Sequence, residues 1–188
     1  MITIDGNVLP PVPQRVVIML HKPRGYVTTL SDEHGRKTAA QLIDIAQRVY
    51  PIGRLDMQSE GLLLFTNDGA LANRLMHPSK QIDKVYEVTV TGAGEDGATL
   101  LRRPILLDGR RITPPTVVLL DQRGEKSIFR VTIHEGRNRQ IRRMCEAAQM
   151  QVLRLKRVQE GAIFLGNLPC GQWRYLTPPE IKRLEEER

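Results

Sequence analysis

The sequence contains few aromatic residues, only two cysteines and no pattern of metal-binding histidines. Aromatic side chains make up 4% of the 188 residues, so any base stacking must come from one or two rings rather than from a ring-covered surface. Cys145 and Cys170 match no metal or redox spacing, and reduced structural thiols suit a cytoplasmic protein. The four histidines form neither an HExxH nor an HxH pattern, so we predict no metal site.

Long hydrophobic runs are also missing. The longest, 16–20 and 61–65, are far too short to span a bilayer, and the N-terminus shows no signal-peptide pattern. We therefore expect no membrane partner.

The residues that are present favour a folded, basic protein. Apolar residues make up 40% of the chain, which argues against global disorder. The 28 lysines and arginines outnumber the 21 acidic residues, which gives a net charge of +7. This excess favours a polyanion as the partner. The length allows one substantial domain or two small ones.

Strand and helix patterns alternate irregularly along the chain. Strands are expected at 16–20, 61–65, 84–92, 127–135, 152–158, 162–166 and 174–176, with an extended stretch at 112–120. Helices are expected at 38–50, with Thr38 as N-cap and Pro51 beyond its end, and at 70–77, 95–103, 137–150 and after Thr177. Because several strands follow one another directly, an α+β fold is favoured over a doubly wound parallel sheet.

In the stretch GRLDMQSEGLLLFTNDG, residues 53–69, one carboxylate, Asp56, lies between Arg54 and a leucine-rich strand. From this stretch alone, the simplest interpretation of Asp56 is a turn or N-cap residue, or a surface partner of Arg54. The leucines imply surroundings of low dielectric constant, where a carboxylate stays ionised only beside a cation. A functional role for Asp56 therefore requires a buried cation from elsewhere in the chain.

A cluster of arginines in EGRNRQIRRM, residues 135–144, is the obvious donor of that cation. The alternative is a solvated basic helix face. Ile141 and Met144 show that part of the segment faces the core, and arginine tolerates burial because it can grip a carboxylate with two hydrogen bonds. We expect one arginine to turn inward and the others to meet phosphate.

Tyr86 in KVYEV, residues 84–88, shares one strand face with Val88, while Val85 and Glu87 share the other. Considered alone, Tyr86 is a core tyrosine with a satisfied hydroxyl. Beside a nucleic-acid site, its ring could instead stack on a base.

These segments and the L-x-R of 155–157 occur in one order, and together they resemble the RsuA-type ribosomal RNA pseudouridine synthases, the group that includes RluB, RluE and RluF. The resemblance covers about residues 22–176. It implies a central, mostly antiparallel mixed sheet with flanking helices and an active-site cleft across it. The GLLLFTNDG and LANRLMHPS segments are most similar to the RluB branch, which acts on the large ribosomal subunit.

Family members usually carry an S4-like RNA-binding domain ahead of the catalytic domain. Here ITIDGNV resembles only its final strand and turn. We therefore expect residues 1–14 to be an N-terminal arm that corresponds to the end of such a domain, and 15–188 to be the catalytic domain. Either the protein is a short form or the chain is a fragment.

The resemblance also implies roles for individual residues. Asp56 matches the catalytic aspartate, Tyr86 the ring that stacks on the flipped uridine, Arg142 the inward cation beside the aspartate, and Leu155 an apolar residue packed against the site. Arg54 matches the arginine that enters the RNA stack. Other RNA contacts are expected from Lys22, Arg24, Arg137, Arg139 and Arg143. The reaction implied needs no metal and no cofactor, and we expect a monomer that binds ribosomal RNA or a pre-ribosomal particle.

Two other functions compete with this one. The charge alone would also suit a non-catalytic ribosomal RNA-binding protein, although such a protein gains nothing from a desolvated Asp56 facing a polyanion. A glycoside hydrolase would need a second carboxylate, for which Glu60 is the only nearby candidate.

Overall fold

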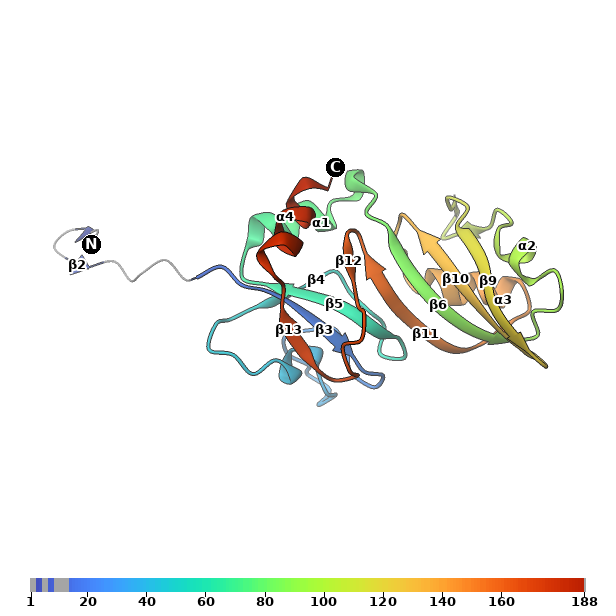
Figure 1. Cartoon of the computed structure of the whole chain (residues 1–188), viewed down its shortest axis with the longest axis horizontal. Coiled ribbons are helices and arrows are strands. Elements are labelled where there is room, and N and C mark those ends of the chain that lie inside the picture. The colour runs from blue at the N-terminus through green and yellow to red at the C-terminus, as the bar shows by residue number, and fades with distance from the viewer. Residues whose placement is uncertain (1–2, 5–6, 9–13, 188) are drawn as a thin grey trace.

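Figure 1 shows the computed structural model of the chain, which describes residues 3–4, 7–8 and 14–187. In the expected N-terminal arm, the short strands β1 (Thr3–Ile4) and β2 (Asn7–Val8) pair antiparallel. The other arm residues up to position 13 lie outside the described residues, so the boundary between the arm and the catalytic domain stays a prediction.

The main body is one sheet with helices packed against it. The sheet contains β3 (Val17–Lys22), β4 (Tyr50–Ile52), β5 (Glu60–Thr66), β6 (Lys84–Thr91), β9 (Thr116–Arg123), β10 (Lys126–Ile133), β11 (Gln151–Glu160), β12 (Ile163–Phe164) and β13 (Trp173–Tyr175). The hairpin of β7 (Leu106–Leu107) and β8 (Arg110–Arg111) is separate. The helices are α1 (Gly69–Met76), α2 (Gly97–Leu101), α3 (Gln140–Ala147) and α4 (Pro178–Glu186), and the 3₁₀ turns are η1 (Ala39–Leu42) and η2 (Pro78–Lys80).

The strand order is β13-β3-β5-β11-β6-β10-β9, with β4 added to β5 and β12 added to β11. All the neighbours in this sheet are antiparallel except β5 and β11, which run parallel. This confirms the expected α+β fold with a mostly antiparallel mixed sheet. The parallel pair is the junction between two halves of the sheet.

Gly61 makes this junction possible. Its φ is +109°, and a Cβ at this position would lie 2.2 Å from the backbone oxygen of Arg157 on β11. Backbone atoms cannot rotate away as a side chain can, so only glycine allows the two strands to approach this closely.

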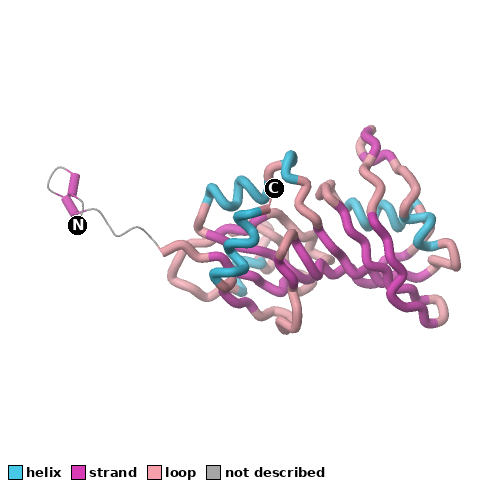
Figure 2. Tube along the Cα trace, turned by 45° about the horizontal axis from the view of Figure 1, so that its top comes forward, coloured by secondary structure: helices cyan, strands magenta, loops and turns pink. Residues whose placement is uncertain are grey.

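Two apolar clusters pack against the sheet. Figures 1 and 2 show α1 and α4 at the half of the sheet that contains β3 and β5, and α2 and α3 at the other half. Helices α1 and α4 bury Leu71 and Leu184 against Leu62 and Leu64 of β5. Helix α3 and the turn of α2 pack against β6, β10 and β11 in the other cluster. That cluster includes Leu101, Ile141, Met144, Val88, Phe129 and Leu155, and it extends to Leu63 and Phe65 on the other face of β5. Both faces of β5 are therefore buried, which explains its continuous apolar sequence.

The helix expected at 38–50 is wrong. Thr38 does precede a helical turn, and its amide donates to Gln41 Oε1 at 3.0 Å, but the turn ends at Leu42 and Ile43 is already extended. The β-branched residues that follow have low helix propensity, and Ile43 and Ile45 pack on the core from an irregular chain. Pro51 lies within β4, which pairs with one neighbour only, and proline is tolerated in such a strand.

Candidate active site

A cleft of about 960 Å³ lies between the loop 53–56, strands β6 and β11, and the segment that leads into α3. This volume is near the upper end for ligand pockets, which span about 300–1,000 Å³. The cleft brings together six of the predicted site residues, namely Asp56, Tyr86, Leu155, Arg54, Arg137 and Arg139. Segments distant in sequence thus meet at one site.

Asp56 sits on a loop that is held at several points. The Thr28 hydroxyl donates to the Leu55 carbonyl oxygen at 2.7 Å and accepts from the Leu55 amide at 3.1 Å. On the other side, the amide of Gly25 donates to the carbonyl oxygen of Met57 at 2.8 Å. The Asp56 side chain itself is half-buried. The carboxylate is therefore presented to the cleft from a fixed backbone, as catalysis by positioning requires.

Lys22 was expected to contact phosphate, and the structure places it elsewhere. It is the last residue of β3, its side chain is fully buried, and its Nζ donates to the carbonyl oxygens of Ser59 at 2.8 Å and Pro23 at 2.9 Å. Burial lowers the pKa of the Lys22 ammonium to about 8, while the carboxylates of Asp56 and Glu60 oppose this shift. Lys22 is thus a buried cation under the Asp56 loop rather than part of the RNA-facing surface.

Replacing Lys22 by methionine should lower turnover about 10- to 100-fold, because the loop loses its anchor and Asp56 a nearby positive charge. RNA affinity should not change, because the ammonium is buried. The charge of Lys22 is present below about pH 8 and is lost as the pH rises through that value. Wild-type turnover should therefore decline above about pH 8, and the variant should lack this decline.

The same lowered pKa predicts how stability depends on pH. The unfolded chain keeps the Lys22 proton up to about pH 10.5 and so binds more protons than the folded chain above about pH 8. The contribution of Lys22 to the free energy of unfolding should then rise with pH across this window. Lys126→Met, at an exposed position on β10, is the control. If Lys22→Met lost RNA affinity and the control Lys126→Met did not, Lys22 would have to be a phosphate contact after all.

Arg142 was expected to hold Asp56 directly. Its Nη2 instead donates to the carbonyl oxygen of Gln58 at 2.9 Å, and no ion pair joins Arg142 to Asp56 among the described residues. Burial and then Arg139 lower the pKa of Arg142, and the field of Asp56 opposes them. Arg142 therefore holds the backbone of the Asp56 loop through the Gln58 carbonyl oxygen. Its interaction with the Asp56 carboxylate is a longer-range electrostatic attraction.

Arg24 lies beside Arg142, outside the main cleft. The two side chains line a second cavity of about 300 Å³ together with Met57 and Gln58. Arg24 donates to the carbonyl oxygen of Leu153 and lies 3.4 Å from the carboxylate of Glu60. A phosphate contact of Arg24 would thus belong to this second surface and not to the cleft that holds Asp56.

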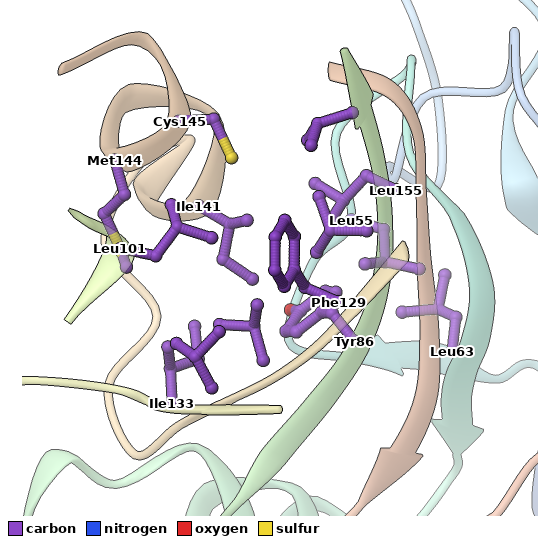
Figure 3. Packing of buried hydrophobic residues seen from close by; sticks show 14 of the residues in the cluster. Leu55, Leu63, Tyr86, Leu101, Phe129, Ile133, Ile141, Met144, Cys145 and Leu155 are labelled. Atoms are coloured by element: carbon purple, nitrogen blue, oxygen red, sulfur yellow. The ribbon is translucent and has the colours of Figure 1, made fainter. Parts of the chain in front are cut away.

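Tyr86 and Leu155 form the apolar wall of the cleft. Tyr86 is 7% exposed and Leu155 is 4% exposed, and Figure 3 shows both near Leu55 and Ile141 in the core cluster. Burial raises the pKa of the Tyr86 phenol. The ring is thus part of the core and also lines the cleft, so the structural and functional interpretations of this residue are both consistent with its position.

Arg157 is a cleft residue to which sequence analysis gave no role. It is fully buried below the cleft and lies opposite Tyr86 in the pairing of β11 with β6. The L-x-R pattern could have indicated that Arg157 belongs to the cleft, because Leu155 and Arg157 are two apart on a strand and so face the same side. The sequence could not show that its neighbour on that side is Tyr86.

The expected helix at 137–150 begins later, at Gln140, so Arg137 and Arg139 lie in the segment before it. Arg139 has a left-handed φ of 50° and an exposed side chain, and like exposed Arg54 it forms no ion pair among the described residues. Arg137 is held by Glu135 at 2.9 Å. Arg54 and Arg139 are thus the two predicted RNA contacts whose charge stands unpaired at the cleft.

Arg143 does not line the cleft. Its guanidinium pairs with both oxygens of Asp108, at 3.0 and 3.1 Å, and this contact lowers the pKa of the Asp108 carboxyl. The expected phosphate contact of Arg143 does not fit this placement, because its charge is already matched by a carboxylate.

Arg139→Gln should therefore weaken RNA binding, whereas Arg143→Gln should not. Loss of one phosphate contact with single-stranded RNA should also reduce the slope of log affinity against log salt by about 0.7. Filter binding over a range of KCl concentrations measures both quantities. Equal losses in the two variants would contradict the assignment of the free cation.

The carboxylates of the cleft other than Asp56 are held by arginines. Glu135 pairs with Arg137, and Glu160 lies 3.1 Å from Arg157. Glu60, the second carboxylate that a glycoside hydrolase would have used, does not line the cleft and is paired with Arg154.

Within residues 3–4, 7–8 and 14–187, no cluster of three or more potential metal ligands occurs, and no helix is long and apolar enough to cross a membrane.

Comparisons with known proteins identify the class to which this fold and site belong. The family model for RNA pseudouridylate synthases matches residues 16–147, and the chain belongs to this family. A crystal structure of a pseudouridylate synthase superposes with a TM-score of 0.82 at 31% identity, over 94% of this chain and 76% of that one. A structure from the archaeal box H/ACA sRNP has a TM-score of 0.56 at 20% identity, which shows a shared fold alone.

Among sequence relatives, ribosomal large subunit pseudouridine synthase B of Bacillus subtilis (strain 168) is 46% identical over 90% of this chain and 71% of its own length. The protein of the same name from Vibrio cholerae is 39% identical over 98% of this chain, which spans 60% of that protein. The resemblance inferred from the ordered motifs is therefore confirmed at the level of the family.

Proposed function

We propose that the chain isomerises a specific uridine of ribosomal RNA, in the large subunit, to pseudouridine. The observation that carries the proposal is the position of Asp56, fixed by its loop at the wall of a cleft that also contains Tyr86 and Leu155. The unpaired Arg54 and Arg139 at the same cleft suit an RNA backbone. The names of the Bacillus and Vibrio relatives support the large subunit as the source of the substrate.

The geometry suits a flipped nucleotide. Chemistry on a base cannot be performed inside a helix, and extruding the base costs a few kcal/mol. The cleft offers the buried face of Tyr86 for the uracil ring and Leu155 as an apolar neighbour, and Arg54 lies two residues from Asp56, where it can occupy the space that the base leaves in the RNA stack.

The reaction breaks the bond from C1′ to N1 and forms one from C1′ to C5. C5 loses a proton and N1 gains one, so the product has the same atoms as the substrate and no redox change occurs. Asp56 is the group assigned to the sugar side of this exchange. That the protein acts as a monomer, without metal or cofactor, and in the cytoplasm stays a prediction from the sequence.

Release of tritium from ribosomal RNA labelled at uridine C5 tests the proposal directly, because the C5 hydrogen leaves only if isomerisation occurs. We expect release by the wild-type chain from large-subunit RNA. Pseudouridine mapping in a strain that lacks the protein should show one missing modification. RNA binding without tritium release, from free RNA and from assembly intermediates alike, would favour the non-catalytic RNA-binding protein instead.

A further inference from the structure

Two charged residues below the cleft, Arg157 and Glu160, take no direct part in the bond exchange at C1′. Arg157 is 1% exposed and Glu160 is 6% exposed. The Nη2 of Arg157 lies 3.1 Å from Oε2 of Glu160, and its Nε donates to the carbonyl oxygen of Leu62 at 2.7 Å. A buried ion pair is a poor source of stability, because desolvation of both charges offsets their attraction. Its presence at this depth calls for another explanation.

The pair depends on an irregularity in β11. Residues three apart on a regular strand point to opposite faces. The register of β11 against β6 shifts between Arg157 and Gln159, so that one extra residue is accommodated there. This bulge lets Glu160 reach the same side as Arg157, and bulges are known to redirect side chains next to active sites.

The side chain of Arg157 is also a neighbour of Tyr86. Arg157 lies directly opposite Tyr86 in the pairing of β11 with β6, so the two side chains share one face of the sheet, and both line the cleft. The guanidinium contacts the Glu160 carboxylate and the Leu62 carbonyl oxygen, and Tyr86 is its neighbour across the strand pair. These two contacts fix the cation, and its place opposite Tyr86 allows it to fix the phenol.

We propose that Arg157 and Glu160 form a positioning pair that holds the Tyr86 hydroxyl, and so the face of its ring, in place for the flipped uridine. Glu160 and Leu62 hold the guanidinium, and the guanidinium holds the hydroxyl. This inference rests on the proposed function, since it assigns Tyr86 to the substrate. The proposal explains both the bulge in β11 and the buried ion pair, because both are needed to hold Tyr86.

The charges around the phenol agree with this arrangement. Burial raises the pKa of Tyr86, the positive charge of Arg157 opposes that shift, and the carboxylates of Glu160 and Asp56 reinforce it. Removal of Arg157 would therefore expose the phenol to the negative charges of these two carboxylates without the opposing positive charge.

A double-mutant cycle tests whether Arg157 acts through Tyr86. Arg157→Met should lower kcat for tritium release about 100-fold, as expected for a misplaced catalytic group, and leave KM nearly unchanged. In a Tyr86→Phe background, the same substitution should cost little further activity, because the hydroxyl that it positions is already gone. Arg174→Met, which breaks the remote pair with Glu180 at 2.7 Å, is the control and should match wild type. Equal losses in both backgrounds would overturn the proposal.

Glu160→Gln provides a second test, which keeps the buried arginine and does not require a measurement of activity. With tyrosines labelled by ¹³C at Cζ, the Tyr86 resonance is identified by its absence in Tyr86→Phe. We expect Glu160→Gln to shift this resonance and to leave those of Tyr26, Tyr50 and Tyr175 unchanged. An unmoved Tyr86 signal would overturn the pair even if Arg157→Met fails to fold. Since this readout needs no RNA, a wild-type chain without isomerase activity would reject the proposed function separately.

Discussion

Asp56→Asn should abolish isomerisation and leave RNA binding nearly intact. Asparagine keeps the shape of the side chain, and the contacts that hold the loop are made by Thr28, Gly25 and Lys22 with backbone atoms, which the substitution does not touch. Only the carboxylate is lost. Removal of a catalytic group of this kind lowers kcat by about 10⁴-fold or more. Tritium release from uridine labelled at C5 measures the effect, and filter binding measures the affinity.

The matched control is Asp44→Asn, which removes the same charge from an exposed position outside the cleft. It should leave both rate and affinity as in wild type. If Asp56→Asn retained turnover within about tenfold of wild type, the carboxylate would not be the reacting group and the proposed role of Asp56 would be rejected.

Gly61→Ala should strongly destabilise the whole molecule, although it adds only one methyl group. The new Cβ would lie 2.2 Å from the backbone oxygen of Arg157, and the residue would have to keep a φ of +109°. Overpacking costs about 1–3 kcal/mol, and a left-handed backbone costs a residue with a Cβ roughly another 1–2 kcal/mol. A combined loss of about 2–5 kcal/mol would lower Tm by roughly 4–20 °C in a chain of this size. Thermal unfolding followed by circular dichroism measures it.

Gly124→Ala separates the two causes. Gly124 also has a positive φ, +57°, but a Cβ there would meet nothing within 4 Å. Its Tm should fall only by the backbone part of the cost, and turnover below Tm should be unchanged. Gly61→Ala should lose turnover even where it is folded, because Arg157 must move away from Gly61. Equal Tm values for the two variants would show that the close approach of β5 to β11 is not under strain.

The sequence predicted those parts of the fold and site that depend on local pattern. The alternation of KVYEVTVT placed Tyr86 and Val88 on one face of β6, and the leucine run placed Asp56 just ahead of a buried strand. The ordered motifs supplied the family. What it could not supply is the neighbour of each charged side chain in space. Lys22 and Arg143 belong to basic clusters in the sequence, yet one is buried under the Asp56 loop and the other is paired with Asp108.

Similar reasons explain the remaining differences. Thr38 is a good helix cap, but the chain after Leu42 is held by core contacts that override the local signal. The pairing of Arg157 with Glu160 depends on a bulge that leaves no mark in the alternation of side chains. A sequence therefore shows that a basic cluster is present more readily than it shows the role of each lysine or arginine in it.

The parallel pairing of β5 with β11 also governs when the site exists during synthesis of the chain. The contact of Arg157 with Leu62 joins residues 95 positions apart, and contacts of such high sequence separation form slowly. Asp56 precedes β5 and Tyr86 lies on β6, so both leave the ribosome well before β11 does. We therefore expect a nascent chain that ends before Gln151 to carry the Asp56 carboxylate and Tyr86 without the strand that sets them side by side. Activity would then begin only after β11 has been made, and we expect that an incomplete chain could not modify the RNA of the ribosome that is still producing it.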